Sequence, residues 1–230
     1  MQPYFFPYIG YFQLMNIVDE FVVYDNIQYT KKGWINRNRI LLNGKDQFIT
    51  IPLKKGSDFL IVNERLLSEN WDSDKKYMIN LMKSSYSKAP FFKDIFPVIE
   101  DCIMYKNENL FDFVFYSITS LKNYLNISTE LILSSNLPID HSLKSVDKVI
   151  SICKLKNASI YVNLIGGTQL YKSEDFIEVG VNLRFLKSNL INYKQFDNEF
   201  MPFLSIIDVM MFNGIACTRN AINKSFTLIN

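Results

Sequence analysis

Histidine is nearly absent from this sequence, since His141 is the only one among 230 residues. The cysteines, Cys102, Cys153 and Cys217, are odd in number and far apart. A single histidine excludes a histidine-rich metal site, and no cysteine pair has the spacing that zinc requires. The sequence therefore predicts no metal site, and its cysteines indicate reduced thiols in the core of a cytoplasmic protein.

Long apolar runs and an excess of charge of either sign are also missing. No uninterrupted apolar stretch approaches the ~18 residues of a membrane-spanning helix, and no basic-then-apolar leader is found, so we expect no membrane span. The formal net charge of +2 is too small to indicate nucleic-acid binding. No serine lies in the pattern of a nucleophile elbow. Membrane-spanning, nucleic-acid-binding and serine-hydrolase functions are therefore not expected.

Short apolar strands alternate with helices in the second half of the chain. The expected strands are residues 130–133, 158–163 and 181–186, and the helices are 143–154 and 173–179. This alternation predicts parallel strands with right-handed crossovers. We therefore predict a single α/β domain over residues 1–230, with a mostly parallel three-layer, Rossmann-like sheet. A helical cap or insertion is expected at about residues 72–126, from apolar residues at helical spacing.

The first quarter of the chain combines a helix at about residues 10–18, a strand at 21–24 and a hairpin. Asn43 and Gly44 accept the positive φ values of a two-residue turn, which predicts a hairpin between residues 34–42 and 47–53. A helix followed at once by a buried strand suggests a βαβ unit, so we expect a further strand just upstream of residue 1. At the other end we expect a last buried helix at 203–212 and an edge strand at 226–229.

The loop over residues 2–10 is the first candidate for a binding site, because strand ends and the following helix starts line the ligand crevice of α/β sheets. Two prolines stiffen the loop, and free amides at the helix start could hold an anion. The candidate substrate-binding residues are Gln2, Tyr4 and Tyr8, with Gln2 foremost because its amide both donates and accepts. The alternative is a rigid connection packed by its tyrosines.

The segment 25–39 supplies the second group of candidates. On an extended strand Arg37 and Arg39 share one face, while Asn36 and Asn38 share the other. Two arginines on one face can fork onto a phosphate or carboxylate, and Trp34 can stack on a ligand. The alternative is a hairpin that keeps its charges in water. The candidates are Gln28, Trp34, Asn36, Arg37, Asn38 and Arg39.

A double glycine, Gly166-Gly167, follows the strand at 158–163 and is the third candidate. It permits close approach of a ligand to the backbone, although a turn would also explain it. It lacks the spacing of a dinucleotide fingerprint or a P-loop, so no cofactor can be named. The candidate binding residues here are Asn163, Gly166, Gly167 and Tyr171, and Tyr193 and Gln195 from a later turn could complete a pocket.

His141 and Asp208 are isolated titratable residues. His141 precedes a helix and is a candidate catalytic residue, with an ordinary solvent-exposed histidine as the alternative. Asp208 lies in an apolar helix, where a carboxylate must be paired or open to a cleft, because burial alone is costly. We expect a structural role for Asp208, bonded to a neighbouring loop.

These residues, taken in order, resemble the WbqC-like family over essentially the whole chain. The matching motifs are Gln2-Pro3 through Gly10-Tyr11-Phe12, Asp25 with Gln28, Trp34 with Asn36-Arg37-Asn38-Arg39, Gly166-Gly167 with Tyr171, and Leu204 through Asp208. In relatives a short apolar strand precedes the opening motif, in agreement with the strand expected upstream. Many relatives carry a histidine where this chain has Met1.

The resemblance implies a cytoplasmic role in surface-polysaccharide biosynthesis, in which sugars of the O-antigen of lipopolysaccharide are decorated. The reaction would transfer an acyl or aminoacyl (glycyl-like) group to a nucleotide-linked amino sugar. Arg37 and Arg39 would then bind the diphosphate, Trp34 would stack on the ligand, and Asp25 would be the catalytic base. Two alternatives stay open, a non-catalytic nucleotide-sugar binding module and a nucleotidyl transferase, although the histidines of nucleotidyl transferases are missing.

Overall fold

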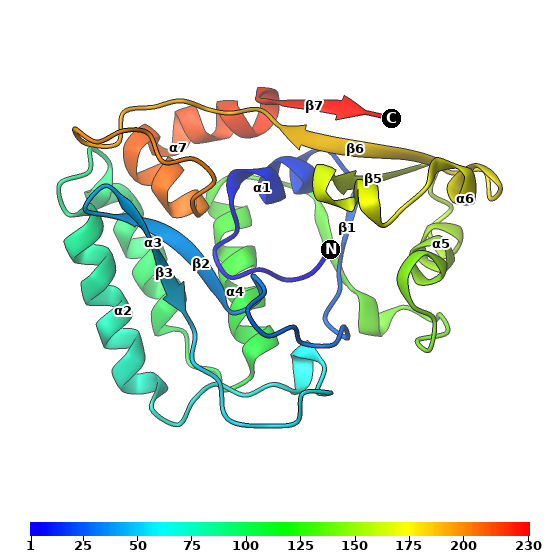
Figure 1. The fold of residues 1–230 in the computed structure, drawn as a ribbon, viewed down its shortest axis with the longest axis horizontal. Coiled ribbons are helices and arrows are strands. Elements are labelled where there is room, and N and C mark those ends of the chain that lie inside the picture. Colours follow the sequence, from blue (N-terminus) through cyan, green and yellow to red (C-terminus); the bar gives the residue numbers. More distant parts are fainter.

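The protein has a mixed α/β structure in which helices surround three small sheets (Figure 1). The computed structural model describes residues 1–230. The helices are α1 (Ile9–Asn16), α2 (Trp71–Tyr86), α3 (Phe92–Met104), α4 (Leu110–Tyr124), α5 (Ser145–Leu155), α6 (Ser173–Ile177) and α7 (Ile206–Lys224). The strands are β1 (Glu20–Val23), β2 (Arg37–Leu42), β3 (Lys45–Thr50), β4 (Glu130–Leu133), β5 (Ile160–Leu164), β6 (Asn182–Ser188) and β7 (Phe226–Ile229). Three short 3₁₀ helices are η1 (Val62–Glu64), η2 (Ser134–Asn136) and η3 (Ile165–Gln169). None of the helices is both long enough and apolar enough to cross a bilayer.

The strands do not form the single, mostly parallel three-layer sheet that we expected. β1 pairs with β4 in parallel, β2 pairs with β3 antiparallel, and β6 pairs with β5 in parallel and with β7 antiparallel. On the other edge of β1, Met1 N donates to Val22 O at 2.7 Å and Met1 O accepts from Tyr24 N at 2.8 Å. Because β1 and β5 share no ladder, the parallel pairs belong to separate sheets. The strand expected upstream of residue 1 lies outside the described residues.

The predicted hairpin and the helical middle of the chain are confirmed. Asn43 and Gly44, with φ of 50° and 76°, connect β2 to β3 as a two-residue turn. α2, α3 and α4 fill the stretch predicted to be helical, and they pack next to one another at the left of Figure 1. Pro97 lies inside α3, where it cannot donate a backbone hydrogen bond. The division into domains stays a prediction.

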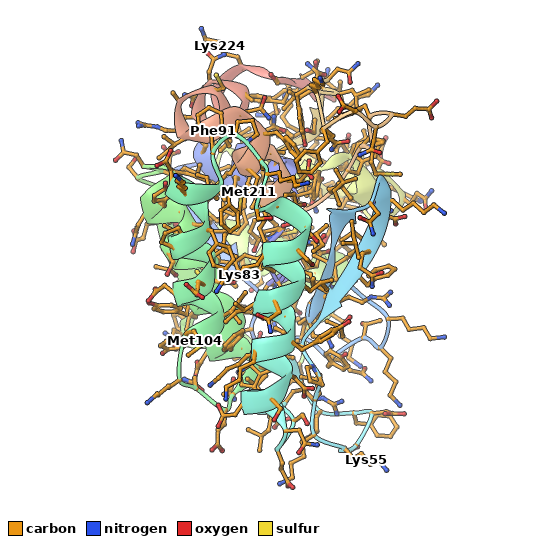
Figure 2. The ribbon with its side chains drawn as sticks, turned by 90° about the vertical axis from the view of Figure 1, so that its left-hand side faces the viewer. Lys55, Lys83, Phe91, Met104, Met211 and Lys224 are labelled. Atoms are coloured by element: carbon orange, nitrogen blue, oxygen red, sulfur yellow. The ribbon has the colours of Figure 1, made fainter.

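The last helix is longer than the sequence pattern predicted, because α7 continues to Lys224 instead of ending near residue 212. Gly214 interrupts it with φ 68° and ψ 176°, and a Cβ at this position would be 2.7 Å from the Phe91 ring. Figure 2 shows Phe91 beside Met211, whose backbone O accepts from Phe91 N at 3.1 Å. The left-handed φ and the close ring both require glycine at this kink.

The loop before α1 is part of the hydrophobic core. Phe5 and Phe6 are fully buried. Asn38 Nδ2 donates to their carbonyl oxygens at 3.0 and 2.8 Å, and Ser205 Oγ donates to Phe6 O at 2.7 Å. Buried carbonyls are costly when they lack a partner. The loop is therefore fixed between β2 and the start of α7. At Phe5 and Phe6 it is a rigid connection, which was the alternative to a binding loop.

Asp208, near the start of α7, is fully buried and paired with three neutral groups. Its Oδ2 accepts from Tyr86 Oη at 2.9 Å, and its Oδ1 accepts from Tyr193 Oη and Gln195 Nε2 at 2.7 Å each. Tyr86 Oη also accepts from Leu41 N at 2.9 Å. Burial raises the pKa of Asp208, while these hydrogen bonds act in the opposite direction. The network ties α2, β2 and the loop before α7 together, which is the structural role expected of Asp208.

Replacing Tyr86 by phenylalanine tests this network. Tyr86→Phe leaves the Leu41 N–H without its acceptor and removes a donor from Asp208, so we expect the free energy of unfolding to fall by about 1–3 kcal/mol. Urea unfolding at pH 7 measures the loss. Tyr77→Phe is the matched control on the same helix, because Tyr77 is 70% exposed and its change should be within about 0.5 kcal/mol. Equal losses for both variants would contradict the role of the network.

Candidate functional site

Two parallel strands end side by side at the candidate site. Val23, the last residue of β1, pairs with Leu133, the last residue of β4. Tyr24, Asp25 and Asn26 follow β1, and η2 follows β4 at the same edge. Ligands of α/β proteins bind at the carboxyl ends of parallel strands. The paired strands thus bring Asp25 to the kind of edge at which ligands bind.

Asp25 is held in a fixed position at this edge. It is 2% exposed, its Oδ1 accepts from Ser135 N at 2.9 Å, and its Oδ2 accepts from Asn63 Nδ2 at 3.1 Å. A carboxylate removed from water needs such donors. Because both donors are neutral, Asp25 has hydrogen bonds but no direct ion pair.

Lys148, from α5, is a buried cation near Asp25 that was not predicted from the sequence. It is 2% exposed, its Nζ lies 3.4 Å from Asn26 Oδ1, and Nζ is 4.5 Å from the centroid of the Tyr24 ring. Burial lowers the pKa of Lys148, while the charge of Asp25 acts to raise it. The available signal was a lysine four residues before Ile152, on the apolar side of a predicted helix.

His141 reaches the same cluster through Asn26. Asn26 Nδ2 lies 3.0 Å from His141 Nδ1, and His141 Nε2 lies 3.1 Å from Leu137 O. Because the Lys148 ammonium can only donate, it faces the Asn26 oxygen and leaves the Asn26 nitrogen to donate to His141. His141 Nδ1 thus faces the Asn26 amide nitrogen, and His141 Nε2 faces Leu137 O. We call Tyr24, Asp25, Asn26, His141 and Lys148 the strand-end cluster.

The end of β5 carries Asn163 and the two glycines predicted to bind a ligand. Burial first, and then the charge effect of Tyr171, raise the pKa of Tyr24. Asn163 Oδ1 accepts from Leu164 N at 2.7 Å. A Cβ on Gly167 would lie 3.0 Å from the Asn163 amide, whereas a Cβ on Gly166 would meet nothing within 4 Å. Gly167 is thus explained by packing, but Gly166 borders open space.

Met1 bonds to Val22 O and to Tyr24 N, so it lies opposite Val23 in a parallel arrangement. The next residue, Gln2, therefore lies level with Tyr24. The Gln2 carbonyl accepts from Tyr11 Oη at 3.1 Å, while the Gln2 side chain is partly exposed and makes no hydrogen bond within the protein. Its amide is therefore free to bind a ligand at the strand ends.

Tyr4 and Tyr8 pack against the start of α1. Burial, followed by the effect of Tyr4, raises the pKa of Tyr8 to about 12. The Tyr8 ring covers Gly10, where a Cβ would lie 2.4 Å from the ring. Tyr8 also lines a small cavity of about 30 Å³ together with Tyr193, large enough for about one water. The predicted pocket at Tyr193 is therefore small.

The face of the β2–β3 hairpin carries a stack of aromatic rings and arginines. The Trp34 and Phe48 ring centroids are 6.2 Å apart. The Arg37 guanidinium lies 4.6 Å from the Phe48 centroid, and that of Arg39 lies 5.6 Å from the Trp34 centroid. Trp34 and Phe48 are 39% and 42% exposed. We call these four residues the hairpin platform, and it offers flat surfaces to solvent.

The charged ends of both platform arginines already have partners. Arg37 donates to backbone carbonyls of the preceding loop, among them Gly33 O at 3.0 Å. Arg39 Nη1 pairs with Asp46 Oδ2 at 3.1 Å. An anionic ligand would have to displace these contacts before either arginine could fork onto it. No hydrogen bond, ion pair or ring contact joins the hairpin platform to the strand-end cluster.

Asn36 and Asn38 lie on the opposite, buried face of the hairpin, as strand alternation predicted. Asn36 Nδ2 donates to Ile51 O at 2.8 Å and its Oδ1 accepts from Tyr29 Oη at 2.9 Å, while Asn38 binds the first loop. Gln28 Nε2 donates to Asp58 O at 3.0 Å. The polar atoms of Asn36 and Asn38 are thus used within the protein, whereas Gln28 is exposed and uses only its Nε2.

A larger cavity lies elsewhere, at the start of α2. It measures about 640 Å³ and is lined by residues of both charges, among them Lys54, Glu69 and Lys106. None of the residues proposed from the sequence lines this cavity. We therefore assign the candidate site by the strand ends and their buried charges rather than by volume.

Lys148→Met tests whether the buried lysine costs stability. A lowered pKa means that the folded state binds the proton more weakly, so the cost is present in full at neutral pH and disappears as pH rises towards 10.5. We expect Lys148→Met to be as stable as the wild type or more stable by about 1 kcal/mol at pH 7, with a smaller difference at higher pH. Urea unfolding at the two pH values measures this. A loss above about 2 kcal/mol would identify Lys148 as structural.

Comparisons with known proteins agree with the resemblance seen in the sequence. No solved structure matches the chain significantly. The uncharacterized protein Rv1507c of Mycobacterium tuberculosis (strain ATCC 25618 / H37Rv) is 29% identical over 216 residues, which cover 93% of this chain and 91% of that protein. Residues 2–220 match the WbqC-like protein family. The chain therefore belongs to the WbqC-like protein family.

Proposed function

We propose that the protein is a cytoplasmic enzyme of surface-polysaccharide (O-antigen) biosynthesis that transfers an acyl or aminoacyl group to a nucleotide-linked amino sugar. The substrate class comes from the family resemblance. The observation that carries the assignment to an enzyme is Asp25, which is 2% exposed and fixed by Ser135 N and Asn63 Nδ2 at the end of β1. A carboxylate positioned in this way is suited to proton transfer.

In the proposed reaction the amino nitrogen of the sugar attacks the carbonyl carbon of an activated donor, such as a thioester or an aminoacyl ester. A C–N bond forms and the bond between that carbon and the leaving group breaks. Asp25 accepts the proton that the nitrogen loses and returns it to the leaving group. The step is balanced without a metal or a redox partner.

The hairpin platform is the proposed contact surface for the flat parts of the substrate. Trp34 and Phe48 are partly exposed, and base or sugar faces stack on such rings. Arg37 and Arg39 stiffen the platform through their ring contacts, and their hydrogen bonds and ion pair leave few free donors for a diphosphate. This supports stacking at the platform more than the forked diphosphate contact first expected of the arginines.

The alternative is a non-catalytic module that binds a nucleotide-linked sugar. The observation in its favour is that both Asp25 oxygens already accept hydrogen bonds from the protein, as they would in a purely structural role. A nucleotidyl transferase is the weaker alternative, since His141 bonds to Asn26 and Leu137 and no second histidine is available.

A screen against nucleotide-linked amino sugars, with and without acyl donors, separates these functions. For the transferase we expect a rise in melting temperature with the sugar, and a mass increase of the sugar when the donor is present. Thermal shift and mass spectrometry measure the two effects. A thermal shift with no product for any donor would favour the binding module, and dependence on ATP and magnesium would favour the nucleotidyl transferase.

Asp25→Asn tests the catalytic base. We expect kcat to fall by about 10²–10⁴-fold while sugar binding, measured by thermal shift, is kept. Asp19→Asn is the matched control, because Asp19 is exposed and precedes the opposite end of β1. Unchanged product formation by Asp25→Asn would refute the assignment of Asp25, whatever the fate of the control.

A further inference from the structure

We propose that Lys148 binds an anionic oxygen group of the ligand, a phosphate or a carboxylate, at the carboxyl ends of β1 and β4. Lys148 would then bind the negative group of the ligand that Arg37 and Arg39 were expected to bind. The inference does not depend on acyl transfer, because it applies to any ligand that carries such a group.

The first support is the unused capacity of the lysine. An ammonium has three donors, yet the only hydrogen bond of Lys148 Nζ is a long one, 3.4 Å to Asn26 Oδ1. Lysine is almost never fully buried unless it is paired. Lys75 is an example of a buried lysine with an ion pair, since it is 7% exposed and bonds directly to the Asp72 carboxylate. Lys148 is more deeply buried and has no such partner.

The groups around Lys148 do not supply this partner. Asp25 attracts it over a longer distance, but the two form no ion pair, and both Asp25 oxygens are occupied by Ser135 and Asn63. The Tyr24 ring contributes a cation–π contact, and His141 faces Asn26 rather than the lysine. A small anion against Nζ would complete the coordination of the lysine and reduce the cost of its burial.

A second, independent observation comes from Ser134. Ser134, the residue after β4, is fully buried and its Oγ has no hydrogen-bond partner. By the β1–β4 register it lies level with Tyr24, the residue that contacts Lys148. Buried polar groups without partners call for an explanation, and a bound oxygen-rich group provides one.

The arginines are less suitable, because each already donates to partners within the hairpin region. Lys148 is the one buried cation of the strand-end cluster with donors to spare. The Lys148 ammonium would donate to a phosphate oxygen and to a carboxylate oxygen in the same way. The experiment therefore uses one small phosphate probe and one small carboxylate probe.

The test is the melting temperature of the full chain with added sodium pyrophosphate or sodium acetate, each compared with chloride at equal ionic strength and pH 7. We expect at least one anion to raise the melting temperature of the wild type. In Lys148→Met the apparent Kd should rise about tenfold or more, since a charge-assisted hydrogen bond contributes about 1.5–3 kcal/mol. A response to pyrophosphate indicates a phosphate site, and a response to acetate alone indicates a carboxylate site.

Lys75→Met is the control for loss of a buried lysine, and it should respond like the wild type. Lys148→Gln serves if the methionine variant folds poorly. Arg37→Gln is the competing variant. The proposal is overturned if the wild type responds to neither anion, if Lys148→Met keeps the full response, or if Arg37→Gln alone abolishes it.

The outcome is separable from the proposed function. An anion response lost in Lys148→Met would stand even if the sugar screen gave no product. Conversely, product formation with unchanged KM and kcat in Lys148→Met would remove Lys148 from the site and leave the transferase proposal intact.

Discussion

Two buried side chains, Asn38 and Ser205, hold the first loop from opposite sides, and the rest of the structure depends on this double attachment. Their donors satisfy the carbonyls of Phe5 and Phe6, whose rings fill the centre of the core. Once the loop is fixed, α1 begins at a defined place and β1 can return beside Met1. The position of the strand ends, and with it the candidate site, follows from a few hydrogen bonds to backbone oxygens.

Buried charges in this protein fall into two kinds. Asp208 receives three hydrogen bonds from neutral donors and joins several elements, so its buried carboxyl group has partners. Lys148 is equally hidden but has one long contact. The first arrangement stabilises the fold, whereas the second leaves a buried ammonium short of partners, which the proposed anion would supply. The two residues differ in their hydrogen-bond partners and not in their burial.

Local signals in the sequence predicted more of the fold than of the site. Asn43-Gly44 predicted the hairpin because turn chemistry acts over two residues, and alternation predicted that Arg37 and Arg39 share a face. The partners of those arginines depend on tertiary packing, which no local pattern encodes. Lys148 was not predicted for the same reason, since its hydrogen-bond partner, Asn26, is 122 residues away in the sequence. The sheet was wrongly predicted as continuous because alternation of elements predicts parallel pairing but not which strands are neighbours.

The double attachment of the first loop also sets an order in biosynthesis. The bonds that close the N-terminal region reach Ser205, and Gln13 Nε2 donates to Ala221 O and Ser225 O at 3.1 and 2.9 Å. These partners are separated from the loop by about two hundred residues of chain, and at about 5–20 residues per second they leave the ribosome many seconds later. The bonds from the N-terminal region to Ser205, Ala221 and Ser225 can therefore form only near the end of synthesis, after Asn38 is already available.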